Sequence, residues 1–230
     1  MSLRTFRNAL IVMGAFLVVI WVLQIVNWAG HYRLDYEFGI LPDHVSRLPE
    51  IFTAPFLHFG WQHIEGNSVP LFVLGVLAAY RSLVRFLIAS LIIAVASGLA
   101  VWLFQGSNEL TVGASGLIFG YFGYVLVRGF FDRNFVDIGV GLVAGVLYWT
   151  ILSVAIPGTP GVSWIGHLGG LVGGVAAAWA LRTRNSRPVA AAARPGVAAY
   201  PGANARPGAA PRPGAKSVDD LLRELKEEGF

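Results

Sequence analysis

The chain has no cysteine and few charged residues. Because none of its 230 residues is Cys, disulfides, zinc–thiolate sites and a cysteine nucleophile are excluded. Charged side chains make up 13% of the sequence and hydrophobic ones 55%, whereas soluble domains average about 25% and about 45–50%. This deficit of charge predicts a membrane protein. The net charge of +4 does not indicate nucleic-acid binding, because the arginines gather at the ends of apolar segments and form no basic stripe.

Apolar runs of membrane-spanning length recur along the first 182 residues. A spanning helix needs about 20 mostly apolar residues. Segments of this kind, or close to it, run over 8–28, 63–80, 84–104, 115–128, 136–156 and 165–182. The first is too long for a signal-peptide core and lacks a small-residue cleavage site, so we expect it to be retained. The sequence therefore predicts an all-α membrane protein whose domain, residues 1–182, is a bundle of six transmembrane helices.

Arginines mark alternate ends of these segments. They precede the first segment, lie between the second and third and between the fourth and fifth, and follow the sixth: Arg4, Arg7, Arg81, Arg85, Arg128, Arg133, Arg182, Arg184 and Arg187. Only the long connection after the first segment departs from this pattern, with Arg33 and Arg47. Since cytoplasmic loops are enriched in Arg and Lys, both termini are predicted to be cytoplasmic. The excess of Arg over Lys suggests a GC-rich bacterial genome, and hence the inner (plasma) membrane.

Three stretches outside the apolar segments have compositions of their own. Residues 29–57 form a long outer loop rich in proline and large apolar side chains, and we expect short interfacial helices there. Residues 183–216 repeat Pro-Gly every six residues, which predicts a disordered cytoplasmic linker. Residues 217–230 begin with a capping box, Ser217 and Asp220, and carry apolar residues on one helical face. This short amphipathic helix would either bind a cytoplasmic partner or form a frayed tail.

The polar side chains picked out inside the predicted helices share one depth. They are His63 and Asn67 in the second segment, Ser115 in the fourth and His167 in the sixth. Counting about 1.5 Å per residue from the arginines that follow, Asn67, Ser115 and His167 all lie about 20–22 Å above the inner boundary. Polar residues in membrane segments are costly and mark functional sites. Since 115–128 is too short to span alone, non-helical backbone must line a wet cavity above Ser115.

Ser115 and His167 together have the chemistry of a nucleophile and a base. Gly113-Ala114-Ser115-Gly116 places small residues around a helix N-terminus, whose free amides suit an oxyanion hole. An imidazole with a free pKa of about 6.5 can take the serine proton and return it to a leaving amine. No carboxylate lies at that depth, so we expect a dyad. Each residue also has a structural interpretation, the serine in helix packing and the histidine as a partner of a backbone carbonyl.

Further residues support this interpretation. Glycines four apart, Gly116 and Gly120 in the fourth segment and Gly166, Gly170 and Gly174 in the sixth, would let these helices pack closely. His63 and Asn67 share a helix face and could bind an oxyanion or join two helices. A metal site of His58, His63 and His167 is disfavoured because His58 precedes the helix and no carboxylate accompanies the set. We therefore expect no metal and no cofactor.

These motifs resemble those of the rhomboid family of intramembrane serine proteases. The match comprises His58-x4-His63-x3-Asn67, Gly113-x-Ser115-Gly116 and His167-x2-Gly170-x3-Gly174, in the family's order over residues 1–182. The resemblance implies that Ser115 is the nucleophile and His167 the base. It also implies that His63, Asn67 and the Ser115 amide form an oxyanion hole, with Gly113 as a supporting residue. His58 would be a structural histidine. Substrates would be single transmembrane helices, entering past a gate formed by 136–156 and the loop 157–163.

Two positions depart from the family pattern, and two other functions compete. Many bacterial members stack a tyrosine on the catalytic histidine, where this chain has Phe119, which keeps the stacking but lacks the hydroxyl. Many also carry a Trp-Arg pair in the first outer loop, where this chain has Pro49 and Glu50. One alternative is a catalytically inactive relative that binds or escorts membrane proteins. The other, a transporter or channel, is disfavoured because the inner halves of the helices carry almost no polar residues.

Overall fold

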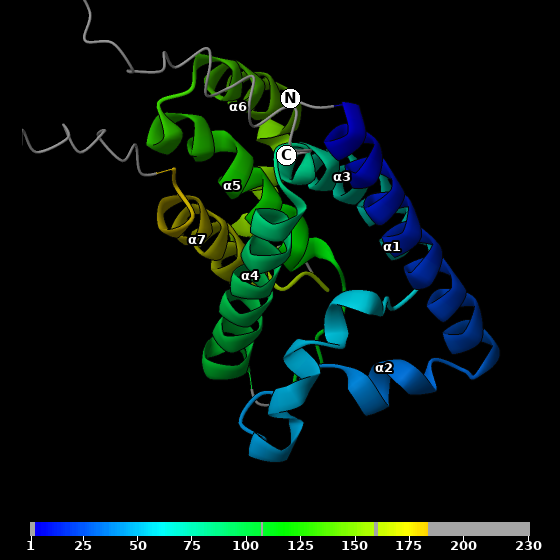
Figure 1. The fold of residues 1–230 in the computed structure, drawn as a ribbon. Helices are drawn as coiled ribbons and strands as arrows, with labels where there is room; N and C mark the ends of the chain where they lie inside the picture. Colours follow the sequence, from blue (N-terminus) through cyan, green and yellow to red (C-terminus); the bar gives the residue numbers. More distant parts are fainter. Residues whose placement is uncertain (1–2, 107, 159–160, 184–230) are drawn as a thin grey trace, which may run out of the picture. The chain divides into compact units, whose positions relative to one another are not determined.

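The computed structural model describes residues 3–106, 108–158 and 161–183, and within them every predicted apolar segment is helical (Figure 1). The long helices are α1 (Leu3–Ala29), α3 (Trp61–Ala79), α4 (Leu83–Phe104), α5 (Ser115–Asp132), α6 (Phe135–Tyr148) and α7 (Trp164–Ala180). The prediction of an all-α domain is confirmed for these residues. Apart from Thr183, the predicted linker 183–216 and the whole helix 217–230 lie outside them.

Three helices are long and apolar enough to cross a bilayer by length and composition. These are α1, α4, and a span that runs from Phe135 to Ser153. That span consists of α6 and most of the 3-10 helix that follows it, η3 (Trp149–Ala155). α3, α5 and α7 have 19, 18 and 17 residues, which corresponds to about 26–29 Å at 1.5 Å per residue. Such lengths come close to the hydrocarbon thickness of about 30 Å.

Local sequence signals set several of the helix ends. The side chain of Ser82 accepts a hydrogen bond from the Arg85 amide at the start of α4. Asn134 does the same for Asp137 at the start of α6. These caps satisfy amides that have no partner inside their own helix. α5 ends where Arg133 adopts a left-handed conformation, with φ 51°, a common way to terminate a helix.

α5 lies at the centre of the bundle. It contacts α3, α4, α6 and α7, and its buried residues include Phe119, Tyr121 and Phe122. α1 packs against α3 instead, and the two run side by side in Figure 1. Since α5 begins at Ser115, the candidate nucleophile is carried by a helix that packs against four other long helices.

The predicted end of the fourth helical segment, at residue 128, was wrong. α5 continues past Arg128 to Asp132. Arg128 is only 4% exposed; its Nη2 lies 3.2 Å from Asp137 Oδ1, and Arg81 Nε is 2.7 Å from the same oxygen. The Tyr80 hydroxyl also donates to Asp137. This pairing lets Arg128 stay buried inside the helix, because a buried charge without a partner is strongly destabilising.

The long connection after α1 folds into the expected short helices. They are α2 (Arg33–Phe38), η1 (Val45–Ile51) and η2 (Ala54–Phe56). Arg47 organises them: its Nη2 donates to the carbonyls of Tyr36 (2.8 Å) and Gly39 (2.9 Å), and its Nε lies 2.7 Å from Glu50 Oε1. Glu50, one of the two departures from the family pattern, thus holds an arginine that fixes the loop.

A buried polar cluster joins α1 to this connection. Gln24, Asn27 and Asp35 are 0–1% exposed, and Asn27 Oδ1 accepts a hydrogen bond from the Leu34 amide (3.0 Å). The sequence survey of polar residues overlooked Gln24 and Asn27, although both lie in the first apolar segment. Burial raises the pKa of Asp35 from 3.8 to about 6, while the side chain of Asn27 acts in the opposite direction. The ionised carboxylate is therefore destabilising in this position.

Replacing Asp35 by Asn should stabilise the protein at neutral pH. The folded state binds the Asp35 proton more tightly than the unfolded state, so its contribution to stability is present below about pH 4 and is lost as the pH rises through about 6. Above pH 6 the variant should gain about 1–3 kcal/mol, since one pKa unit corresponds to about 1.4 kcal/mol. Thermal unfolding in detergent from pH 4 to 8 measures this. Asp43→Asn, at an exposed site, is the control, and a gain that does not vary with pH would contradict the prediction.

Candidate active site

A cavity of about 1090 Å³ collects the polar residues that the sequence singled out. Its lining includes His63 and Asn67 from α3, Ser115 from α5 and His167 from α7. The described residues of the stretch 105–113 are non-helical, as predicted, and many of them form part of the wall. Three helices and one extended segment therefore bring polar groups into a single hollow.

α5 and α7 touch backbone to backbone along their glycine faces. A Cβ added at Gly170 would lie 2.1 Å from the Gly116 carbonyl oxygen, and one at Gly174 would lie 2.0 Å from that of Gly120. Both distances are far below van der Waals contact, and the neighbour is backbone that cannot rotate away. The close packing predicted from the four-residue glycine spacing is therefore present.

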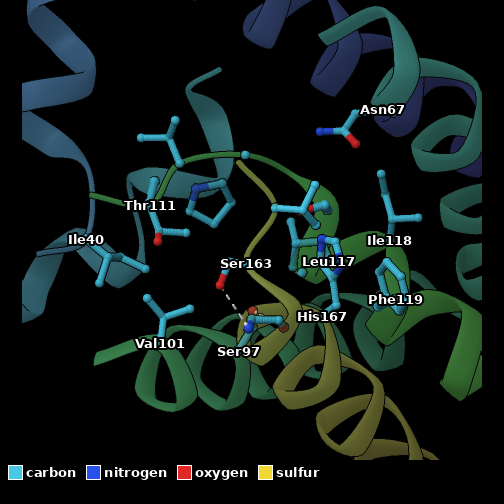
Figure 2. Close-up of a pocket in the computed structure, with 18 of the residues that line it drawn as sticks. Ile40, Asn67, Ser97, Val101, Thr111, Leu117, Ile118, Phe119, Ser163 and His167 are labelled. Atoms are coloured by element: carbon cyan, nitrogen blue, oxygen red, sulfur yellow. Dashed lines mark hydrogen bonds between the residues drawn. The ribbon is translucent and has the colours of Figure 1, made fainter. Parts of the chain in front are cut away.

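This contact sets Ser115 and His167 at the same end of the helix pair. Ser115 is the first residue of α5, and His167 lies in the first turn of α7 with 5% of its surface exposed. The ring of Phe119, one turn after Ser115, stacks on the imidazole with centroids 4.2 Å apart and planes 10° from parallel (Figure 2). The stack restricts the plane of the imidazole.

The other side of the cavity brings Asn67 and His63 close to Gly113. Gly113 has φ 128°, a conformation that favours glycine. A Cβ there would lie 2.7 Å from His63 Cε1 and 3.8 Å from Asn67 Nδ2. Among the described residues, the buried Nδ2 of Asn67 has no hydrogen-bond partner. A buried amide donor without a partner is costly, so this donor is suited to an acceptor that enters the cavity.

His58 supports the start of α5. It is 0% exposed, and its Nε2 accepts a hydrogen bond from the Ala114 amide (3.4 Å). Its ring meets His63 edge-on, with centroids 5.0 Å apart. Burial, and secondarily the neighbouring His63, lowers the pKa of His58 to about 3. His58 is therefore neutral at physiological pH, as an acceptor must be.

A comparison with protein families assigns most of this region. Residues 45–184 match the family model of the rhomboid domain, which covers α3 to α7 and every residue of the cavity except Ile40.

The chain belongs to the rhomboid family.

Several curated proteins are similar in sequence, and one of them is named as rhomboid-like. A Mycobacterium tuberculosis protein described as uncharacterized is 39% identical over 174 residues, which cover 72% of each chain. A Mycobacterium leprae counterpart, also uncharacterized, is 34% identical over 72% of this chain and 68% of its own. Rhomboid-like protein 11 of Arabidopsis thaliana chloroplasts is 30% identical over 71% of this chain and 65% of its own. With its apolar helices, this rhomboid is a multi-pass membrane protein that resides in a lipid bilayer.

Sequence reasoning missed several polar residues that line the cavity of this rhomboid domain. Ser97, Gln105 and Ser163 all line the cavity, and Ser97 Oγ donates to the Gly166 carbonyl (2.8 Å). Ser163 caps α7 by accepting from the Gly166 amide (3.2 Å). A serine directly before an apolar helix is a capping signal that could have revealed Ser163. Ser97 and Gln105 were not singled out, because the groups that give them a role, the Gly166 carbonyl and the Ser163 hydroxyl, lie 69 and 58 residues away along the chain.

Proposed function

We propose that this rhomboid is an intramembrane serine endopeptidase of the bacterial plasma membrane, with six transmembrane helices and cytoplasmic termini. Its substrates would be the transmembrane helices of other membrane proteins. The observation that carries the proposal is the cavity, where Ser115, His167, His63 and Asn67 from three helices face one space.

In the first step the Ser115 hydroxyl attacks the carbonyl carbon of the scissile peptide bond while His167 takes its proton. The negative charge that develops on the carbonyl oxygen is stabilised by the Asn67 amide, His63 and the Ser115 backbone N–H. That N–H lies at a helix N-terminus, where the helix dipole favours an anion. The Nδ2 of buried Asn67, which has no hydrogen-bond partner among the described residues, supports this role.

Collapse of the intermediate breaks the C–N bond. His167 then gives its proton to the departing amine, and an acyl group remains on Ser115. Water attacks this ester with His167 again as the base, which releases the acid and restores the serine. The Phe119 stack supports catalysis by holding the imidazole in one plane through both proton transfers.

Labelling with a serine-reactive fluorophosphonate tests this proposal. The full-length protein in detergent should form a covalent adduct, and His167→Ala should be labelled at least about 100-fold more slowly, because general-base assistance is lost. His44→Ala, at an exposed position outside the cavity, is the control. Equal labelling of the wild type and His167→Ala would reject an activated serine. A wild type that is never labelled would favour an inactive relative that binds or escorts membrane proteins.

A further inference from the structure

Gln105, the residue that follows α4, connects the segment before α5 to the segment before α7. Among the described residues, no other hydrogen bond joins these two segments. Gln105 is half-buried in the cavity wall. Its Nε2 donates to Thr111 Oγ1 over 2.7 Å, and its Oε1 accepts from the Ser163 hydroxyl. In Figure 2, Thr111 and Ser163 lie on neighbouring parts of the cavity wall. One amide side chain therefore spans the gap between them.

On one side of this bridge, Thr111 leads to the proposed nucleophile. It lies four residues before Ser115, and its own backbone is fixed by two hydrogen bonds with Ile40, at 2.9 and 3.0 Å. Two residues later the Gly113 amide donates to the Ala54 carbonyl (2.9 Å). The approach to Ser115 is therefore fastened to the outer loop, and Gln105 holds it through the Thr111 hydroxyl.

On the other side, Ser163 leads to the proposed base. Its hydroxyl oxygen accepts from the Gly166 amide (3.2 Å), and its carbonyl accepts from the His167 amide (3.1 Å). A shift of Ser163 would therefore move the first turn of α7 and the imidazole with it. The Ser97 hydroxyl in α4 binds the same turn by donating to the Gly166 carbonyl. The turn therefore keeps one hydrogen bond to α4 if the Gln105 side chain is removed.

These hydrogen bonds form a series in which each donor points to the next residue of the series. The Gly166 N–H points to the Ser163 oxygen, and the Ser163 O–H points to the Gln105 carbonyl. The Gln105 N–H then points to the Thr111 hydroxyl. A side chain of this length that accepts at one end and donates at the other meets both requirements, whereas methionine of similar size meets neither.

We propose that Gln105 is a positioning residue of the protease, which aligns Ser115 with His167 by joining the segment before α5 to the cap of α7. The inference rests on the function proposed above. Misplacement of reacting groups by about 1 Å can cost about 100-fold in rate, so the effect should fall on the chemical step. Substrate binding along the rest of the cavity should change little.

Kinetics of the full-length protein in detergent test this role. Gln105→Met should lower kcat for a model transmembrane substrate, and the maximal rate of fluorophosphonate labelling, by about 10–100-fold. KM should change less than about threefold. Gln105→Glu should recover most of the loss, because a carboxylate can accept hydrogen bonds from both the Ser163 and Thr111 hydroxyls. Thr111→Val removes the hydroxyl that Gln105 binds, with little change of shape, and should also lower kcat. This second variant replaces Gln105→Met in the test if Gln105→Met does not fold.

Ser90→Ala is the matched control. The Ser90 hydroxyl forms a comparable hydrogen bond between α4 and α5, 2.9 Å from the Tyr121 hydroxyl, but outside the cavity lining. Its loss should lower thermal stability and leave kcat unchanged. Wild-type kcat in Gln105→Met or Thr111→Val, or a loss that appears only in KM, would overturn the inference while the proposed protease stands. A wild type that neither cleaves nor labels would instead reject the proposed function.

Discussion

Ser115→Ala should abolish cleavage of transmembrane substrates, with a loss of at least about 1000-fold. Removing the nucleophile of a serine protease leaves only the residual catalysis of the oxyanion hole and of binding. Cleavage of a model substrate in proteoliposomes measures the effect. The change removes a single oxygen at the first residue of α5, so folding should be preserved, which a thermal unfolding curve checks.

Ser46→Ala is the control for this experiment, since Ser46 is exposed in the outer loop and does not line the cavity. It should cleave at the wild-type rate. Binding to the same substrate should survive in Ser115→Ala, because the rest of the cavity is unchanged. Cleavage that persists in Ser115→Ala would refute the serine mechanism. A wild type that binds the substrate but does not cleave it would favour the escort function.

The second large effect concerns the contact between α5 and α7. Gly170→Ala should destabilise the fold by about 2–4 kcal/mol, because the new methyl would press on the Gly116 carbonyl oxygen from 2.1 Å and over-packing costs about 1–3 kcal/mol or more. To relieve the clash the helices must separate, which also draws His167 away from Ser115. We therefore expect cleavage to fall at least about tenfold even at temperatures where the variant is folded.

Gly14→Ala in α1 is the matched control, because among the described residues a Cβ at Gly14 meets nothing within 4 Å and Gly14 does not line the cavity. This change should be neutral or stabilise by about 0.5–1 kcal/mol, as alanine favours helix over glycine. Thermal unfolding in detergent and substrate cleavage should be measured for both variants. Equal stability of Gly170→Ala and the wild type would show that the two helices are not held at this separation.

The positions of the long helices along the chain, and one contact between them, were readable from the sequence because they depend on local patterns. Apolar runs gave the positions of the long helices, and the glycine spacing predicted the contact between α5 and α7. The candidate site residues were found because polar groups are rare in such runs. Their roles in catalysis remain predictions for the experiments above.

What the sequence did not reveal depends on side-chain contacts that form only in the folded chain. Arg128 stays inside α5 because Asp137 and the carbonyl of Ala78 surround its guanidinium, and no local pattern reports such pairing. Arg47 likewise looked like an exception to the charge pattern until its carbonyl partners were seen. Gln105 reaches Thr111 and Ser163 only after the chain has folded.

The carboxylate of Asp137 changes how charge at its end of the bundle should be counted. Of the arginines that suggested an orientation, Arg128 is sealed from the surroundings and Arg81 shares the same oxygen, while Arg133 is exposed. An anionic lipid headgroup that approaches this end of the bundle therefore meets fewer unpaired arginines than the sequence places there. The attraction between this protein and acidic lipids should be weaker than a tally of arginines implies.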